Sequence, residues 1–216
     1  MHLGATLSIL VVVLVSLAVH EWAHGFVALL HGDTTARDLG RLTLNPAAHV
    51  DPFGSLALPL ALIASASPLV FAWGRPAPIE HARLRHPRRD TLWVALAGPT
   101  SNLFLAIGFA AGARVMPQSG AWASLRATLV AGVVWNCAIA FFNLIPIPPL
   151  DGAWLLKHVL RLRHILALHH FRLLALALAI AIVALPPSRW LFEASIHRLV
   201  GSCFALFGLS ATGTLH

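Results

Sequence analysis

Charged residues and cysteines are scarce in this sequence. Asp, Glu, Lys and Arg make up 11% of its 216 residues, whereas hydrophobic residues make up 58% and the mean hydropathy is +0.78. A soluble domain of this length cannot bury so much apolar surface, so the composition excludes one and predicts a polytopic membrane protein. The two cysteines, Cys137 and Cys203, both lie in apolar runs, which argues against a disulfide framework or a cysteine-based zinc site.

The apolar runs do not alternate as strands do, and most reach the length of about 20 residues that a membrane-spanning helix needs. Backbone polar groups in lipid must be satisfied internally, so we expect helices. The prediction is an all-α fold of about five to six transmembrane helices in one domain over 1–216, with a core over about 3–160 and C-terminal helices over 161–216. The sequence contains no visible internal repeat, low-complexity tract or appended soluble domain. The runs are Leu3–Leu30, Phe53–Trp73, Leu92–Val115, Trp122–Leu144, Ala153–Leu160, Leu166–Leu185 and Trp190–Leu209.

The net charge of +7 comes almost wholly from arginine, because Lys157 is the single lysine among 15 Lys and Arg residues. A basic chain can bind nucleic acid, but arginines between apolar runs more often fix the orientation of membrane helices. One cluster, Arg75 to Arg89, lies in such a connector. We therefore expect the lipid bilayer as a partner and no nucleic acid.

An HExxH motif, His20-Glu21-Trp22-Ala23-His24, lies within the first apolar run. His20, Glu21 and His24 are the only ionisable side chains between Leu3 and Leu30. A charge at bilayer depth costs about 2.5–3.5 kcal/mol on insertion scales, so such residues are usually functional. Helical spacing places the two imidazoles on one face, where they can hold a zinc ion, with Glu21 beside them as a candidate general base.

A catalytic zinc takes a third protein ligand and keeps one position open for water. Most of the eight acidic residues lie in connectors, but Asp151 follows an apolar run, in a segment with three prolines and a glycine that precludes a regular helix. Irregular backbone at membrane depth is tolerated where it lines a cavity. The alternative is that Asp151 caps a helix that begins near Ala153, and capping and metal binding can coexist.

The order of three motifs resembles that of the site-2 protease family of intramembrane zinc metalloproteases. The motifs are His20-Glu21-x-x-His24, Gly98-Pro99-x-x-Asn102 and Asn143-x-x-Pro146-x-x-Pro149-x-Asp151-Gly152. The lack of a PDZ or CBS domain suggests a compact member. One departure is Ala153, where many members have a second glycine.

The resemblance implies a hydrolase that cleaves peptide bonds in or near transmembrane segments of other membrane proteins. It implies one Zn²⁺ per chain, held by His20, His24 and Asp151, with Glu21 as the general base. Asn102 and Asn143 would bind the substrate backbone or the oxyanion. The oligomeric state and the identity of the substrate do not follow from the sequence.

The two metal motifs must meet at one depth, which constrains the topology. Both lie near the C-terminal ends of their runs, so those runs should cross in the same direction. This requires the run Phe53–Trp73, which Pro59 and Pro68 interrupt, to re-enter rather than span. The basic connectors then share one side with Lys157, so we expect a multi-pass protein of a bacterial or archaeal cell membrane, with its site towards the cytoplasm.

Two other functions remain open from the residues alone. Intramembrane histidines and carboxylates also mark ion pathways, so a zinc or proton-coupled transporter is one alternative, although transporters usually show repeat symmetry. A non-catalytic membrane-protein-binding relative is the other. Among the remaining histidines, His49 lies in a polar connector beside Asp51, where it could fold the connector or support the site. We expect a plain solvated side chain instead.

Overall fold

The computed structural model describes residues 3–64, 73–160, 177, 180–181 and 185–209, and all regular structure in these ranges is helical, without a strand. This confirms the all-α class. Most of the expected C-terminal run Leu166–Leu185 lies outside the described residues. The α-helices are α1 (Leu3–Leu30), α2 (Thr35–Asp38), α3 (Leu58–Ala64), α4 (Pro87–Val115), α5 (Ala123–Asn143), α6 (Gly152–Leu160) and α8 (Pro186–Ala205).

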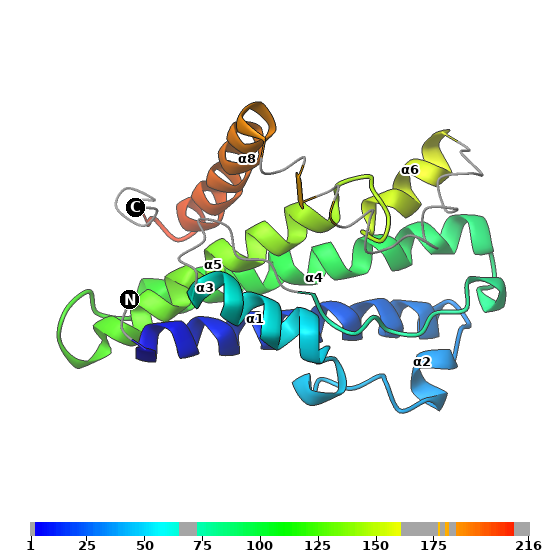
Figure 1. Cartoon of the computed structure of the whole chain (residues 1–216), viewed down its shortest axis with the longest axis horizontal. Coiled ribbons are helices and arrows are strands. Elements are labelled where there is room, and N and C mark those ends of the chain that lie inside the picture. Colours follow the sequence, from blue (N-terminus) through cyan, green and yellow to red (C-terminus); the bar gives the residue numbers. More distant parts are fainter. Residues whose placement is uncertain (1–2, 65–72, 161–176, 178–179, 182–184, 210–216) are drawn as a thin grey trace.

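Three long helices, α1, α4 and α5, pack against one another and form the body of the protein (Figure 1). Among the described residues, these are the helices long and apolar enough to cross a membrane, over Thr6–Leu30, Pro87–Val115 and Gly120–Asn143. They coincide with three of the predicted apolar runs, as a polytopic membrane protein requires. The total of five to six spans stays a prediction.

Side-chain contacts fix the relative directions of these helices. His20 and His24 of α1 contact Asn102 and Val94 of α4, so α4 runs against α1. Ser16, one turn before His20, contacts Asn136 of α5. The C-terminal end of α5 lies at the same end of the helix bundle as the HExxH motif (Figure 1). α1 and α5 therefore run in the same direction. This is the arrangement that the parity of the runs predicts.

The predicted re-entrant segment begins and ends at the same place. Its N-terminal part is a short π-helical turn, Pro52–Ala57, which continues into α3. Where the structure describes the chain again, the Trp73 amide donates to Gly54 O at 3.1 Å and the Ser55 hydroxyl donates to Trp73 O at 2.7 Å. Two ends joined in this way are what a returning segment requires, and a full crossing would separate them.

Residues 73–80, here called the strap, run in extended form from the end of this segment across α1. The Arg75 amide donates to His49 O at 2.7 Å. Arg41 Nη2 donates to Arg75 O at 3.0 Å and to Pro76 O at 3.3 Å. At the far end, the Glu80 amide donates to Asp33 Oδ2 at 2.7 Å. The connector after α1 therefore holds the strap along its length.

The most extensive apolar cluster of the described residues lies in the half of the bundle away from the HExxH motif. Small residues of α4 allow α5 and α8 to approach closely there. The other half of the α1–α4–α5 interface carries buried polar side chains. The buried core residues are Ala106, Ala110, Ala113, Val130, Val133, Cys137, Ile196, Val200, Cys203 and Phe204.

Candidate metal centre

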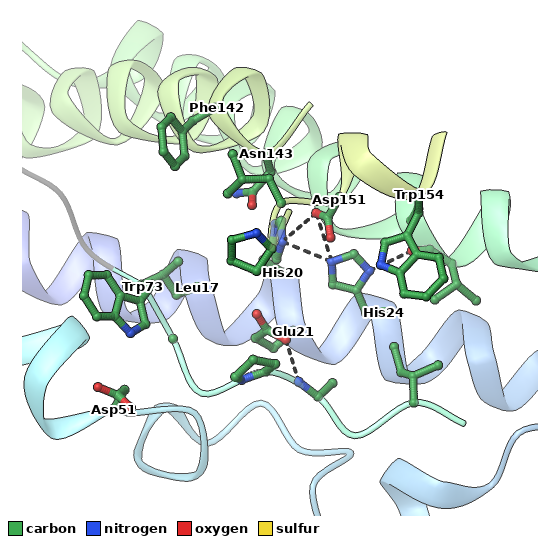
Figure 2. Close-up of a pocket in the computed structure, with 18 of the residues that line it drawn as sticks. Leu17, His20, Glu21, His24, Asp51, Trp73, Phe142, Asn143, Asp151 and Trp154 are labelled. Atoms are coloured by element: carbon green, nitrogen blue, oxygen red, sulfur yellow. Dashed lines mark hydrogen bonds and ion pairs between the residues drawn. The ribbon is translucent and has the colours of Figure 1, made fainter. Parts of the chain in front are cut away.

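His20, His24 and Asp151 converge on one point (Figure 2). The two imidazoles lie on successive turns of α1, and their Nε2 atoms are 3.1 Å apart. Asp151 Oδ2 lies 3.2 Å from His20 Nε2 and 3.3 Å from His24 Nε2. Within the described residues, this is the one group of three His, Cys, Asp or Glu side chains close enough to share a metal ion. The structure therefore brings together the three ligands that the sequence predicts.

The irregular turn after α5 carries Asp151 to α1. α5 ends at Asn143, and the chain makes short turns before α6 begins at Gly152. A Cβ atom at Gly152 would collide with Leu144 O and would lie 2.6 Å from Ile145 O, so only glycine fits directly after the aspartate. Asp151 Oδ2 accepts no hydrogen bond and faces the imidazoles, which leaves it available to a metal.

Both histidines direct Nε2 to this point and hold a hydrogen-bond partner on Nδ1. His24 Nδ1 donates to Val94 O at 2.7 Å, and His20 Nδ1 donates to Asn102 Oδ1 at 2.6 Å. A carbonyl oxygen only accepts, so each Nδ1 carries a proton, and in the neutral imidazole Nε2 then keeps the lone pair that a metal needs. Second partners of this kind are typical of metal-ligating histidines. Three lone-pair atoms so close together repel one another unless a cation lies between them.

The spacing fits a zinc ion. With Zn–N bonds of about 2.0–2.1 Å, two ligands at the corners of a tetrahedron lie roughly 3.3–3.4 Å apart. The observed separations of 3.1, 3.2 and 3.3 Å are close to this edge length. Two imidazoles and one carboxylate form a typical catalytic zinc set, which leaves a fourth position for water or substrate.

Gly98 of α4 provides the space beside the imidazoles. A Cβ atom at this position would collide with His24 Nε2 and would lie 2.6 Å from His20 Nε2. The glycine of the Gly98-Pro99-x-x-Asn102 motif thus lies directly against the metal-binding atoms. No other residue type leaves room for both rings and a cation.

Glu21 faces the same cavity from the next position on α1. Its Oε2 atom accepts a hydrogen bond from the Ala77 amide of the strap at 2.7 Å (Figure 2). The cavity has a volume of about 360 Å³. Its lining includes the three ligands and Glu21, and also Leu17, Trp73, Phe142, Asn143, Leu150 and Trp154.

The structure places the two predicted substrate-binding asparagines differently. Asn143 lines the cavity, and its Nδ2 donates back to Ile139 O at 3.0 Å. Asn102 is fully buried, does not line the cavity, and contacts His20, Asn136 and Ser16. These contacts favour a role beside the metal ligand over the predicted contact with substrate.

His49 differs from the favoured prediction of a solvated side chain. It is 2% exposed, and its Nε2 donates to Thr43 O at 2.8 Å, so it folds the connector that holds the strap. The reason is that the connector packs on α1 instead of extending into solvent. The predicted alternative, a loop-folding role, is the one that the contacts support.

Several site contacts escape sequence reasoning. The Ala77 amide and the Val94 carbonyl act through the backbone, which leaves no signal in the residue type. Asn136 and Ser16 are fully buried polar residues in otherwise apolar helices. That unusual setting is a usable signal, because polar residues inside membrane helices tend to be functional.

Comparison with known proteins identifies the family of the chain. The sequence model of peptidase family M50 matches residues 110–185. A protein of Mycobacterium tuberculosis, named as the candidate zinc metalloprotease Rip2, is 35% identical over 212 residues, which cover 90% of this chain and 78% of Rip2. The chain belongs to peptidase family M50. Membership confirms the site-2 protease resemblance, the class of zinc-dependent metalloendopeptidase and the zinc cofactor.

Two further relatives of this family carry similar names. The candidate zinc metalloprotease YwhC of Bacillus subtilis is 39% identical over 153 residues, which are 67% of this chain and 65% of YwhC, just under two thirds of its length. Rip2 of Mycolicibacterium smegmatis is 29% identical over 197 residues, 89% of this chain and 73% of that protein. No solved structure matches the chain.

Proposed function

We propose that this M50 member is an intramembrane protease that hydrolyses peptide bonds in or near transmembrane segments of other membrane proteins. The observation that carries the proposal is the convergence of His20, His24 and Asp151 on one point, with the Glu21 carboxylate facing the same cavity. A metal ligand set and a general base on one cavity are the parts that metal-assisted hydrolysis needs.

The depth of the site supports a membrane-embedded substrate. His20 and His24 are 3% and 5% exposed and lie within Thr6–Leu30, a helix able to cross the membrane. Much of the cavity wall is apolar, with Leu17, Trp73 and Phe142 among its residues. Such a wall suits the side chains of a transmembrane segment. The substrate must unwind locally, since intrahelical hydrogen bonds otherwise shield its peptide bonds.

The residues of the site divide the proposed mechanism into metal binding, proton transfer and substrate binding. His20, His24 and Asp151 would hold the zinc. When bound, zinc supplies Lewis-acid chemistry, polarising a carbonyl and lowering the pKa of water towards about 7. Glu21, oriented by the Ala77 amide, takes the proton of the attacking water and passes it to the leaving amine. Asn143 lies in the cavity wall, where its amide can bind the substrate backbone or the developing oxyanion.

We place the protein in a bacterial or archaeal cell membrane as a multi-pass protein, with the site towards the cytoplasm. The relatives named above are bacterial. Arginines gather from the strap to the first turn of α4, near the end of α1 where the HExxH motif lies; they are Arg75, Arg83, Arg85, Arg88 and Arg89. Basic connectors of this kind face the cytoplasm.

The test is a Glu21→Gln variant, because glutamine keeps the shape of the side chain but cannot take a proton. General bases contribute about 10²–10⁴-fold to rate, so cleavage of a panel of single-span substrates should fall by at least ~10²-fold. Bound zinc, measured by metal analysis, should stay at the wild-type ratio because the ligands are intact.

The matched control is Glu193→Gln, which removes a carboxylate on α8 that pairs with Arg189 at an exposed site. This variant should cleave at the wild-type rate. A Glu21→Gln protein that cleaves as fast as wild type removes the glutamate from the mechanism. A wild-type protein that carries zinc but cleaves no member of the panel argues against the proposed substrate class.

A further inference from the structure

A chain of buried amide hydrogen bonds runs from the backbone of α5 to the metal ligand His20. Asn136 Nδ2 donates to Gly132 O and to Ser16 Oγ, both at 2.9 Å. Asn102 Nδ2 donates to Asn136 Oδ1 at 2.9 Å. Asn102 Oδ1 in turn accepts from His20 Nδ1 at 2.6 Å. Ser16, Asn102 and Asn136 are all 0% exposed, so no bulk water competes for these bonds.

The order of donors and acceptors in this chain has one solution. Gly132 O is a backbone carbonyl and only accepts, so the Asn136 NH₂ group must point towards it. Asn136 Oδ1 therefore faces Asn102, which must present its own NH₂ group. Asn102 Oδ1 is then left facing His20 Nδ1. That nitrogen must carry the proton, which leaves His20 Nε2 with the lone pair that a metal needs.

We propose that Asn136 and Asn102 are positioning residues that set the tautomer and ring orientation of the zinc ligand His20. Here they are called the amide relay. The inference rests on the proposed zinc site and deepens it, since it assigns Asn102 and Asn136 to the metal rather than to the substrate. His24 needs no such relay, because Val94 O of α4 holds its Nδ1 directly. A backbone carbonyl thus fixes each imidazole: Val94 O binds His24 directly, and Gly132 O acts on His20 through the side chains of Asn136 and Asn102.

The relay also explains why polar side chains occupy the centre of the α1–α4–α5 interface. An unpaired amide in an apolar interior is costly, so each group of the two asparagines is bonded to a partner. Residues that orient a metal-ligating histidine typically contribute about 10–100-fold to metal affinity or activity. Loss of the relay is therefore expected to be measurable as weaker metal binding, without reference to proteolysis.

The experiment measures zinc affinity of the purified full-length protein by competition with a chromophoric chelator, and the visible spectrum of the Co²⁺-loaded protein. Asn136→Leu should weaken zinc binding by about 10–100-fold and change the Co²⁺ spectrum, because His20 can then rotate or change tautomer. The matched control is Thr128→Val, which removes a hydroxyl of α5 that donates to Ser124 O, away from the metal centre. It should leave both readouts at wild-type values.

A second pair of variants separates positioning from packing. Asn102→Asp keeps an oxygen acceptor for His20 Nδ1 in a side chain of equal size, and should bind zinc within a few-fold of wild type. Asn102→Leu removes the acceptor and should lose about 10–100-fold. This pair decides the question if Asn136→Leu does not fold.

The relay and the zinc site can fail separately. The relay is overturned if Asn102→Asp and Asn102→Leu lose equal zinc affinity. It is also overturned if a folded Asn136→Leu keeps the wild-type zinc affinity and Co²⁺ spectrum. In both cases, zinc binding by the wild-type protein still supports the metal centre. A wild-type protein that binds no zinc overturns the metal centre itself.

Discussion

At the scale of single residues, the metal centre requires a residue without a side chain at position 98, where the chain has Gly98. The helix α4 passes so near the imidazoles that a methyl group would collide with His24 Nε2. Alanine is the better helix former by roughly 1 kcal/mol, so a helix propensity argument alone would favour it here. The steric demand of the two rings outweighs that preference.

Gly98→Ala should therefore weaken zinc binding by at least ~10-fold, since one ring or the whole of α4 must move. Gly108→Ala is the control, because a Cβ at position 108 of the same helix meets nothing within 4 Å. Competition with a chelator measures both variants. Equal zinc affinity in the two proteins would show that α4 yields easily and that Gly98 has no special part.

The residue types of the three candidate metal ligands made their convergence predictable from the sequence, whereas the groups that hydrogen-bond to them were not predicted. An aspartate after a proline-rich membrane run and two histidines in an apolar helix are rare enough to stand out. The role of Asn102 was predicted from its motif, and the contacts point to His20 instead of the substrate. The amide of Ala77 leaves no trace in the sequence, because every residue except proline has one.

At the scale of elements, the strap has no regular hydrogen bonds of its own and depends on its anchors. Asp33, 1% exposed, is the anchor at the far end, since its Oδ2 accepts from the Glu80 amide at 2.7 Å. Burial by itself raises the pKa of Asp33, but hydrogen bonds from Thr35 and Glu80 and the charge of Arg83 outweigh it and hold the pKa below 3.8.

Asp33→Asn should lower the unfolding temperature at neutral pH. The amide NH₂ group must face either Thr35 or the Glu80 amide, and a buried donor left without an acceptor costs about 1–3 kcal/mol. The lowered pKa means that the Asp33 contribution is present above pH 3.8 and is lost as the pH falls through the lower folded-state value. The difference between wild type and variant should therefore shrink in acid.

Thermal unfolding in detergent between neutral pH and pH 3 measures this difference. Asp38→Asn is the control, because Asp38 is half exposed and pairs with Arg37 at the surface. It should have little effect at any pH. A constant gap between wild type and Asp33→Asn down to the lowest pH would mean that ionisation of Asp33 does not secure the strap.

The helices themselves followed from the sequence more readily than the connectors. The runs Leu3–Leu30 and Trp122–Leu144 agree with α1 and α5 within a residue or so, because long apolar segments have few alternatives in lipid. α4 begins at Pro87, five residues before the apolar run, since polar residues can extend a helix beyond the membrane. The path of the strap depends on long-range contacts with Arg41, His49 and Asp33, which no local pattern reports.

At the scale of the whole molecule, the metal centre joins segments far apart in the chain. His20 and His24 belong to the first helix, and Asp151 lies at the end of the irregular turn that follows α5. A metal ion bound by these three residues would therefore tie α1 to the α5–α6 turn. The requirement that the two motifs meet at one depth predicted the directions of the runs, because that argument needs only parity and no knowledge of how the helices pack.

Zinc should consequently stabilise the whole fold. A ligand at 100 times its Kd adds about 2.7 kcal/mol, and each kcal/mol shifts the unfolding temperature of a chain of this size by about 2–4 °C. Zinc-loaded protein should thus unfold roughly 5–10 °C above protein stripped by a chelator. Differential scanning measures the shift.

Asp151→Ala supplies the control, because it removes one ligand and should lose most of the zinc-dependent shift. Readdition of zinc to the stripped wild-type protein should restore the higher temperature. Identical curves with and without zinc would place the cation, if it binds, at a position that does not join α1 to the turn.

The hydrogen-bond partners of the two imidazoles differ in how easily a mutation can remove them. A peptide carbonyl persists whatever residue replaces Val94, so substitutions there leave the partner of His24 in place. His20 depends on two particular side chains, and a single codon change at position 102 or 136 can remove its partner. Descendants of this enzyme that lose activity by gradual drift should therefore show damage at these two asparagines while the HExxH signature is still intact.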